Sequence, residues 1–255
     1  MQPLPPLGDT VALFLDFDGT LADIAPRPDA VRLAPDLVSV LDALHARLDG
    51  ALAVVSGRPI AELDAFLAPL RLPAAAEHGA LLRATAGGPA IRPAEDEADG
   101  SLAAALATVE RAARALADRH PGLLVERKTT SVALHYRGAP ALGEQCAETM
   151  RSALRDSPLL ELLPGKCVVE ARPSGVCKGS AIEALMRHAP FAGRTPVFAG
   201  DDVTDEAGFA RVRALGGVAI KVGPGETVAG HRCESPAALR AWLRQAVDAG
   251  ERRRA

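Results

Sequence analysis

One stretch decides the fold of this chain: Val11-Ala12-Leu13-Phe14-Leu15-Asp16-Phe17-Asp18-Gly19-Thr20, in which a continuous apolar run ends abruptly at a carboxylate. Such runs are typical of strands that are buried on both faces, as in parallel sheets. In open parallel sheets, ligands bind in the crevice at the carboxyl ends of the strands. We therefore predict a buried strand at 11–15, with Asp16 and Asp18 at the mouth of a crevice.

Strands and helices alternate on both sides of the chain's middle. The expected elements are strands at 51–55, 196–199 and 217–220, helices that begin at Pro35 and Pro59, and helices around 182–186 and 239–247. Strand–helix alternation indicates right-handed crossovers and a parallel sheet. The fold class is therefore predicted to be α/β, with a Rossmann-like parallel sheet as its core.

The middle of the chain follows another pattern. We expect helices at 101–118 and 141–154, and strands at 123–127, 131–137, 159–163 and 167–172, the last two joined across Pro164-Gly165. Adjacent strands joined by short turns form an antiparallel sheet. This αββαββ segment predicts an inserted α+β domain at 100–175, within a core formed by 1–99 and 176–255.

Composition and charge argue against several classes of protein. The 255 residues are 48% apolar and 24% charged, which is ordinary for a globular protein. A net charge of −3 and 3% aromatic residues argue against a nucleic-acid partner. No stretch approaches the ~18 apolar residues that a membrane span needs. Since the four cysteines form no Cys-x-x-Cys pair, we expect free thiols in a cytoplasmic protein. We expect a monomer.

Five acids are expected to converge from two strand ends: Asp16 and Asp18 from the first, and Asp201, Asp202 and Asp205 from the late one. Without compensation they would repel one another, and their pKa values would rise. A hard divalent cation resolves this conflict, and Mg²⁺ fits best because it takes few carboxylates and accepts a substrate phosphate. Asx turns and helix capping are alternative explanations of these acids.

Two further segments supply what a phosphate needs. Ser56-Gly57-Arg58 follows a strand and offers a hydroxyl and bare backbone N–H groups at a helix start, where anions bind. Lys178-Gly179 opens the helix before the late strand and adds an ammonium group. A solvated surface lysine is the alternative there. The chain has neither a Walker A motif nor a dinucleotide glycine fingerprint.

Taken in order, Asp16-x-Asp18-Gly19-Thr20, Ser56-Gly57-Arg58, Lys178-Gly179 and Gly200-Asp201-Asp202-x-x-Asp205 resemble the four motifs of the haloacid dehalogenase (HAD) superfamily. The inserted segment resembles that superfamily's C2-type cap. Further stretches are similar to trehalose-6-phosphate phosphatases: Glu77-His78-Gly79, Glu126-x-Lys128, Leu134-His135-Tyr136-Arg137, Pro164-Gly165-Lys166-x-Val168-x-Glu170 and Gly200-Asp201-Asp202-Val203-Thr204-Asp205-Glu206.

This resemblance, together with the chemistry of the residues, implies a mechanism. Asp16 would attack phosphorus and form an aspartyl-phosphate, and Asp18 would act as general acid and then as general base. Mg²⁺ would be held by Asp16, the Asp18 backbone carbonyl and Asp201. Ser56 and Lys178 would neutralise the phosphoryl charge, and Asp202 and Asp205 would orient the metal's waters or the lysine. Related pumps that expel ADP carry threonine in place of Asp18, so Asp18 favours an alcohol leaving group.

The substrate-binding residues implied by the resemblance are Gly57, Arg58 and His78 in the core and Glu126, Lys128, Arg137, Lys166 and Glu170 in the cap. An ordinary solvated sheet face and a structural histidine are the alternatives. The implied function is a Mg²⁺-dependent phosphatase that hydrolyses trehalose 6-phosphate, the last step of trehalose biosynthesis. A phosphatase of a sucrose or glycosyl-glycerate phosphate, a phosphomutase and a catalytically silent binding domain remain alternatives.

Overall fold

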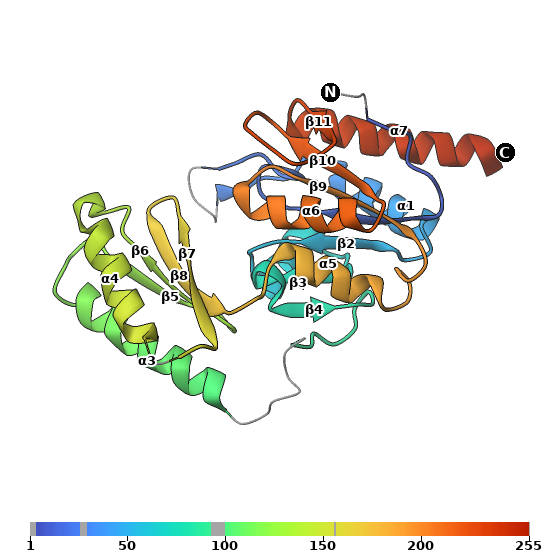
Figure 1. The fold of residues 1–255 in the computed structure, drawn as a ribbon. Helices are drawn as coiled ribbons and strands as arrows, with labels where there is room; N and C mark the ends of the chain where they lie inside the picture. The colour runs from blue at the N-terminus through green and yellow to red at the C-terminus, as the bar shows by residue number, and fades with distance from the viewer. Residues whose placement is uncertain (1–3, 26–29, 93–99, 156, 255) are drawn as a thin grey trace. The chain divides into compact units, whose positions relative to one another are not determined.

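The computed structural model describes residues 4–25, 30–92, 100–155 and 157–254. The chain divides into two compact units, and Figure 1 shows the elements of each. The core unit comprises Met1–Pro93 and Cys177–Ala255, and the inserted unit comprises Ala94–Val176. The domain boundary expected at residue 99 lies outside the described residues.

The described part of the core unit contains one seven-stranded sheet, in the order β11-β10-β9-β1-β2-β3-β4. The strands are β1 Val11–Leu15, β2 Leu52–Val55, β3 Ala74–Ala76, β4 Leu81–Arg83, β9 Thr195–Gly200, β10 Val218–Val222 and β11 His231–Cys233. The pairings are parallel except that of β3 with β4. Strand β1 lies between β2 and β9 with Ala12 to Leu15 wholly buried, so the predicted strand and the α/β fold class are confirmed.

Helices cover the two faces of this sheet. They are α1 Leu37–Arg47, α2 Ile60–Leu67, α5 Lys178–Met186, α6 Glu206–Ala214 and α7 Pro236–Arg254. Helices α5 and α6 pack side by side against the sheet, while α1 packs against α7 (Figure 1). The leucine stripe of α1, including Leu37, Leu41 and Leu44, is buried, as its 3.6-residue spacing predicts. Within the described ranges, no helix is both long and apolar enough to cross a bilayer.

The inserted unit has the predicted αββαββ order. Its elements are α3 Ser101–Ala117, β5 Leu124–Arg127, β6 Val132–His135, α4 Gly143–Leu154, β7 Leu160–Gly165 and β8 Val168–Pro173. The sheet is antiparallel with the strand order β5-β6-β8-β7, and α3 and α4 pack on its apolar face. The predicted turn at Pro164-Gly165 is wrong. Both residues belong to β7, paired with Val169 and Val168, so the turn is Lys166-Cys167.

The core topology brings distant residues to one edge of the sheet. Strands β1, β2 and β9 are parallel neighbours, so their carboxyl ends meet. Asp16, Ser56 and Asp201 each directly follow one of these strands. The backbone N–H of Asp16 donates to the Ala199 carbonyl at 2.9 Å, which fixes the start of the Asp16 loop against β9.

Candidate active site

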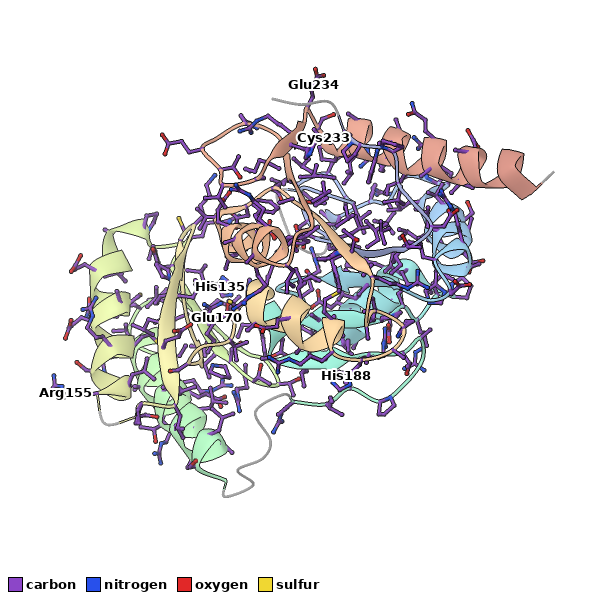
Figure 2. All side chains as sticks on the ribbon, turned by 45° about the vertical axis from the view of Figure 1, so that its right-hand side comes forward. His135, Arg155, Glu170, His188, Cys233 and Glu234 are labelled. Carbon is purple, nitrogen blue, oxygen red and sulfur yellow. The ribbon has the colours of Figure 1, made fainter. Side chains whose placement is uncertain are left out.

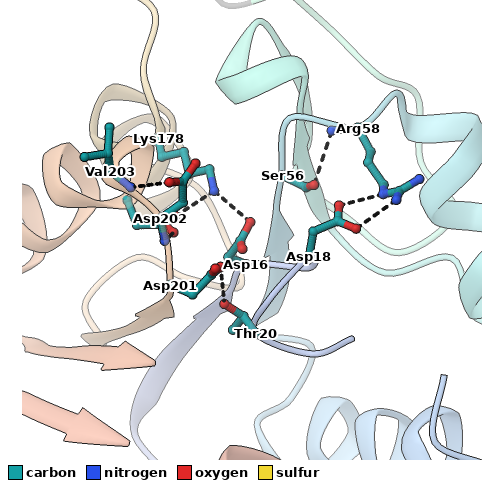
Figure 3. A network of polar contacts seen from close by, with 10 residues as sticks. Asp16, Asp18, Thr20, Ser56, Arg58, Lys178, Asp201, Asp202 and Val203 are labelled. Carbon is teal, nitrogen blue, oxygen red and sulfur yellow. Dashed lines mark hydrogen bonds and ion pairs between the residues drawn. The ribbon is translucent and has the colours of Figure 1, made fainter. Parts of the chain in front are cut away.

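Asp16 and Lys178 form the centre of the site. Asp16 is 4% exposed and Lys178 is 3% exposed, so both charged groups are nearly removed from water. Lys178 Nζ donates to Asp16 Oδ1 at 2.7 Å (Figure 3). It also donates to Asp205 Oδ1 at 2.6 Å. Burial alone would lower the pKa of Lys178, but the charges of Asp16 and Asp205 raise it above its usual value. The lysine is therefore a fixed cation between two carboxylates, not a solvated surface residue.

Among the described residues, Asp16, Asp201 and Asp205 can each offer a carboxylate oxygen within 4.8 Å of the others. Burial raises the pKa of Asp16 well above its usual value, although Lys178 opposes the shift. Burial and the nearby charge of Asp205 raise the pKa of Asp201. The ammonium of Lys178, even with that of Lys221 at the Asp201 backbone, does not balance three carboxylates. The excess negative charge and the all-oxygen donors fit a hard divalent cation.

Two glycines allow this close approach of acids. Gly19 has φ +78°, and a Cβ built on it would lie 2.1 Å from Asp201 Oδ2. A Cβ on Gly200 would lie 2.3 Å from Asp205 Cγ. The buried Thr20 hydroxyl donates to Asp201 Oδ1 at 3.2 Å. The run Asp16–Thr20 therefore supplies a carboxylate, a hydroxyl donor and the space that the Asp201 carboxylate fills.

The structure brings three of the five predicted acids into this cluster, because Asp18 and Asp202 have other partners. Arg58 Nε donates to Asp18 Oδ2 at 2.6 Å and Arg58 Nη2 to Asp18 Oδ1 at 2.8 Å. Figure 3 shows the Asp18 carboxylate directed to Arg58, while that of Asp16 meets Lys178. Asp202 Oδ1 accepts from the Val203 N–H at 2.7 Å, which is the capping role considered as its alternative.

Asp205 holds the loop after β9 in place with both carboxylate oxygens. Its Oδ1 accepts from Lys178, and its Oδ2 accepts from the Asp202 N–H at 2.9 Å. The side chain is wholly buried. Asp205 therefore ties the start of α5 to the loop that carries Asp201.

The loop after β2 packs against the segment after β3. Ser56 is 1% exposed, and its Oγ accepts from the Arg58 N–H at 3.2 Å. The His78 N–H donates to the Ser56 carbonyl at 2.9 Å, with His78 at φ +58°. A Cβ on Gly57 would lie 2.5 Å from His78 Nε2, so the imidazole lies directly on the Gly57 backbone. Ser56, Gly57 and His78 therefore lie together in the structure.

Lys221 is a residue of the site that the sequence reasoning missed. It lies in β10 and is 5% exposed, and its Nζ donates to the Asp201 backbone carbonyl and, at 3.3 Å, to that of Val222. The sequence contains a sign of this role, because a lysine within the apolar strand Val218-Ala219-Ile220-Lys221-Val222 must bury its charge against a partner. Lys221 fixes the backbone that carries the Asp201 carboxylate.

The predicted sugar-binding residues of the inserted unit lie on its sheet and turns. Glu170 is 7% exposed, and its Oε1 accepts from Lys128 Nζ at 3.0 Å and from Ser131 Oγ at 2.5 Å. Ser131 was not predicted. Ala133 pairs with Glu126 on one side and with Glu170 on the other, so both glutamates share the sheet face opposite the helices.

The remaining candidates of this unit are more exposed. Glu126 Oε2 lies 2.8 Å from Nε2 of His135, which Figure 2 labels beside Glu170. Arg137 follows β6 and Lys166 lies in the β7–β8 turn, and both are exposed. The structure therefore gathers Glu126, Lys128 and Glu170 on one face, with the other two at strand ends.

A family model described as trehalose-phosphatase matches residues 14–237. The trehalose-6-phosphate phosphatase of Escherichia coli (strain K12) is 41% identical over 250 residues, which cover 98% of this chain and 91% of that protein. The crystal structure of a trehalose-6-phosphate phosphatase related protein has a TM-score of 0.79 at 30% identity, covering 94% of this chain and 99% of that one. A HAD-superfamily phosphatase from Bacteroides thetaiotaomicron, at 16% identity, shares the fold, with a TM-score of 0.59 and 98% coverage of each chain.

Proposed function

The chain belongs to the trehalose-phosphatase family, and from that premise we propose that it hydrolyses trehalose 6-phosphate to trehalose and inorganic phosphate, the last step of trehalose biosynthesis. One observation carries the proposal: Asp16 Oδ1 lies 2.7 Å from Lys178 Nζ at the carboxyl end of the central strand. A buried carboxylate held by a fixed ammonium is suited to attack phosphorus, because the cation also offsets the phosphate's negative charge.

Asp16 is the proposed nucleophile. Its carboxylate would attack phosphorus in line, giving an aspartyl-phosphate and the sugar alcohol, and water would then hydrolyse this intermediate. The Ser56 oxygen accepts from the Arg58 N–H, which leaves its hydroxyl proton to donate to a phosphate oxygen. Ser56, the Gly57 backbone and Lys178 would together hold the transferring group.

Mg²⁺ is the proposed metal. Asp16, the Asp18 backbone carbonyl and Asp201 would hold it, while Asp205 and Asp202 would orient Lys178 and the surrounding loop. Bound there, the metal would neutralise charge that develops on the phosphoryl oxygens. The raised pKa values of Asp16 and Asp201 support this proposal, because a cation would return both groups to their ionised form.

Asp18 is the proposed general acid and base. A sugar alkoxide is a poor leaving group, so a positioned acid is worth about 10²–10⁴ in rate. Asp18 would give its proton to the sugar oxygen and then take one from the attacking water.

The inserted unit is the proposed sugar-recognition domain. Glu126, Lys128 and Glu170 form a charged group on one face of its sheet, and Arg137 and Lys166 lie beyond the end of the sheet where His135 pairs with Val168. Charged groups that hydrogen-bond several hydroxyls reject sugars that leave them without partners. The four free cysteines support a cytoplasmic location, and we propose that the enzyme acts as a monomer.

A phosphate-release panel tests the substrate assignment. The purified enzyme with Mg²⁺ is compared on trehalose 6-phosphate, sucrose 6-phosphate, glucose 6-phosphate and a glycosyl-glycerate phosphate. We expect kcat/KM for trehalose 6-phosphate to exceed the others by at least about 10²-fold. A higher value for another sugar phosphate would transfer the proposal to that substrate. Transfer of the phosphoryl group to a sugar hydroxyl would indicate a phosphomutase.

A further inference from the structure

Arg58 has a different environment from the one its sequence motif predicts. The motif implies a ligand for the substrate phosphate, yet three guanidinium nitrogens donate to carboxylates of the protein. Nε and Nη2 bind the two oxygens of Asp18, at 2.6 and 2.8 Å, and Nη1 binds Glu62 Oε2 at 2.8 Å. A bidentate pair of this kind fixes both the position and the orientation of the carboxylate.

The local charge is unfavourable for a phosphate ligand. Asp18 and Glu62 together carry two negative charges against the single positive charge of Arg58. Burial alone would lower the pKa of Arg58, but these two carboxylates raise it. Because Arg58, Asp18 and Glu62 together carry a net negative charge, a phosphate dianion would gain little electrostatic stabilisation there. Lys178 is also paired with two carboxylates, but its ammonium lies against Asp16, the proposed nucleophile, whereas the fork of Arg58 is taken up by both oxygens of Asp18.

Aromatic rings hold the guanidinium in place. Arg58 Cζ lies 4.9 Å from the Phe66 ring centroid and 5.6 Å from that of Phe17, and the two rings lie 5.3 Å apart. Phe17, which stands between Asp16 and Asp18 in the sequence, is wholly buried. Consecutive residues of one motif therefore hold Arg58 from two sides, Phe17 by its ring and Asp18 by its carboxylate. The side chain of Arg58 is only 10% exposed, so its position is fixed by the fold.

We propose that Arg58 is a positioning residue for Asp18, whose carboxylate it orients for hydrolysis of the aspartyl-phosphate, and that it does not bind the substrate phosphate. This inference rests on the proposed function, in which Asp18 is the acid and base. Glu62 also binds the guanidinium, at Nη1, so the position of Arg58 does not depend on Asp18 alone. A guanidinium fork binds both oxygens of a carboxylate at once, so Arg58 fixes the direction of the Asp18 side chain for the half of the reaction in which water attacks.

The Asp18 carboxylate takes a proton from water as the water oxygen bonds to phosphorus. The bond between phosphorus and the Asp16 oxygen breaks, its electron pair returns to Asp16, and inorganic phosphate leaves. Asp18 then carries the proton that it can donate to the next sugar oxygen. In the first half of the reaction an aryl phosphate, whose phenolate leaves without an acid, bypasses the need for protonated Asp18.

The test compares Arg58→Met with the unmodified enzyme, on p-nitrophenyl phosphate with Mg²⁺. Acid-quenched samples give the steady-state fraction of enzyme that carries aspartyl-phosphate, and vanadate inhibition gives the affinity for a phosphate-like anion. We expect the phosphorylated fraction to rise, hydrolysis of the intermediate to slow by about 10-fold or more, and the vanadate inhibition constant to stay within about threefold. In an Asp18→Asn background, Arg58→Met should add nothing, because the group that Arg58 positions is already lost.

Arg83→Met is the matched control. Arg83 is 2% exposed and binds both oxygens of Asp64, at 2.8 and 2.5 Å, so it is a second buried arginine–carboxylate pair of the same unit. It should lower the melting temperature and leave the phosphorylated fraction unchanged. If Arg58→Met does not fold, Arg58→Lys carries the test, because lysine keeps the charge and loses the fork.

Three outcomes would overturn the inference: vanadate affinity that falls as much as turnover, no rise in the phosphorylated fraction, or a full additional loss in the Asp18→Asn background. If the unmodified enzyme itself forms no aspartyl-phosphate, and Asp16→Asn retains turnover, the proposed function fails first. The two failures are therefore distinguishable.

Discussion

Gly19 and Asp201, which are far apart in the sequence, share one small space: a Cβ on Gly19 would lie 2.1 Å from Asp201 Oδ2 and 2.4 Å from its Cγ. Gly19 has φ +78°, so glycine is required here both for the left-handed backbone and for the space that the Asp201 carboxylate fills. We predict that Gly19→Ala displaces the Asp201 carboxylate and lowers kcat/KM by about 10²-fold or more, with weaker Mg²⁺ binding in calorimetry.

Gly193→Ala separates strain from displacement. Gly193 has φ +77°, and a Cβ on it would meet nothing within 4 Å. Both substitutions should cost about 1–2 kcal/mol of unfolding free energy through the left-handed backbone. Only Gly19→Ala should change Mg²⁺ binding. Equal Mg²⁺ affinity in the two variants would mean that Asp201 does not contribute to the metal site.

Asp16→Asn tests the nucleophile. The amide keeps nearly the same shape, but it cannot form a stable acyl phosphate and loses the charge that Lys178 binds at 2.7 Å. We expect phosphate release to fall to the detection limit, and no acid-stable phosphoenzyme to form. Circular dichroism should confirm that the fold persists. Appreciable turnover by this variant would assign the attack to another group.

The metal-free protein should be more stable at about pH 5 than at pH 7. Burial raises the folded-state pKa of Asp16 and of Asp201 above the usual 3.8, so the folded chain holds protons that the unfolded chain has released. The stabilisation that these bound protons give the folded state is fully present below pH 3.8 and is lost as the pH rises through the folded-state pKa values. The hydrogen bond from Arg83 lowers the pKa of Asp64, so the stabilisation from this ion pair is lost only below pH 3.8. It does not affect the comparison between pH 5 and pH 7.

Mg²⁺ should remove this pH dependence, because it favours the ionised carboxylates and its binding releases protons. Denaturant titrations at both pH values, with EDTA or with saturating Mg²⁺, measure the effect. EDTA should also abolish phosphate release. The same pH slope with and without Mg²⁺, or full activity in excess EDTA, would exclude a metal at Asp16 and Asp201. Asp201→Asn should flatten the slope in EDTA.

The apolar pattern predicted the central strands because β1, β2, β9 and β10 are largely buried on both faces and therefore consist mainly of apolar residues. It could not predict the edge strands β4 and β11. These strands are three residues long and end or begin with charged or polar side chains, as in Leu81-Leu82-Arg83 and His231-Arg232-Cys233. A short edge strand depends on pairing with its neighbour, which no local pattern contains.

Within the site, the sequence predicted which residues carry charge but not how they pair. A guanidinium fits a carboxylate as well as a phosphate, so Arg58 gave no sign of its contact with Asp18, 40 positions away. The turn Lys166-Cys167 was missed because Cys167 adopts φ +60°, which favours glycine and gave no reason to place the turn there. The approach of Lys178 and of three of the five acids could be predicted because these residues stand at strand ends or at a helix start, in the order of the HAD motifs.

Glu170 offers a test of sugar recognition. Its Oε1 accepts hydrogen bonds from Lys128 and Ser131, and Glu170 is only 7% exposed. Glu170→Ala should lower kcat/KM for trehalose 6-phosphate by about 10²-fold or more, and change that for p-nitrophenyl phosphate by less than about threefold, because the aryl ester has no sugar for the inserted unit to bind.

Glu161→Ala is the matched control: Glu161 lies on the same sheet and binds Arg172 Nε at 2.9 Å. It should affect neither substrate by more than about threefold. Removing one partner of a buried pair can unfold the inserted unit, so Glu170→Gln, which keeps an acceptor for Ser131, is measured alongside. Equal losses on the two substrates, in variants that remain folded, would show that the inserted unit does not select the sugar.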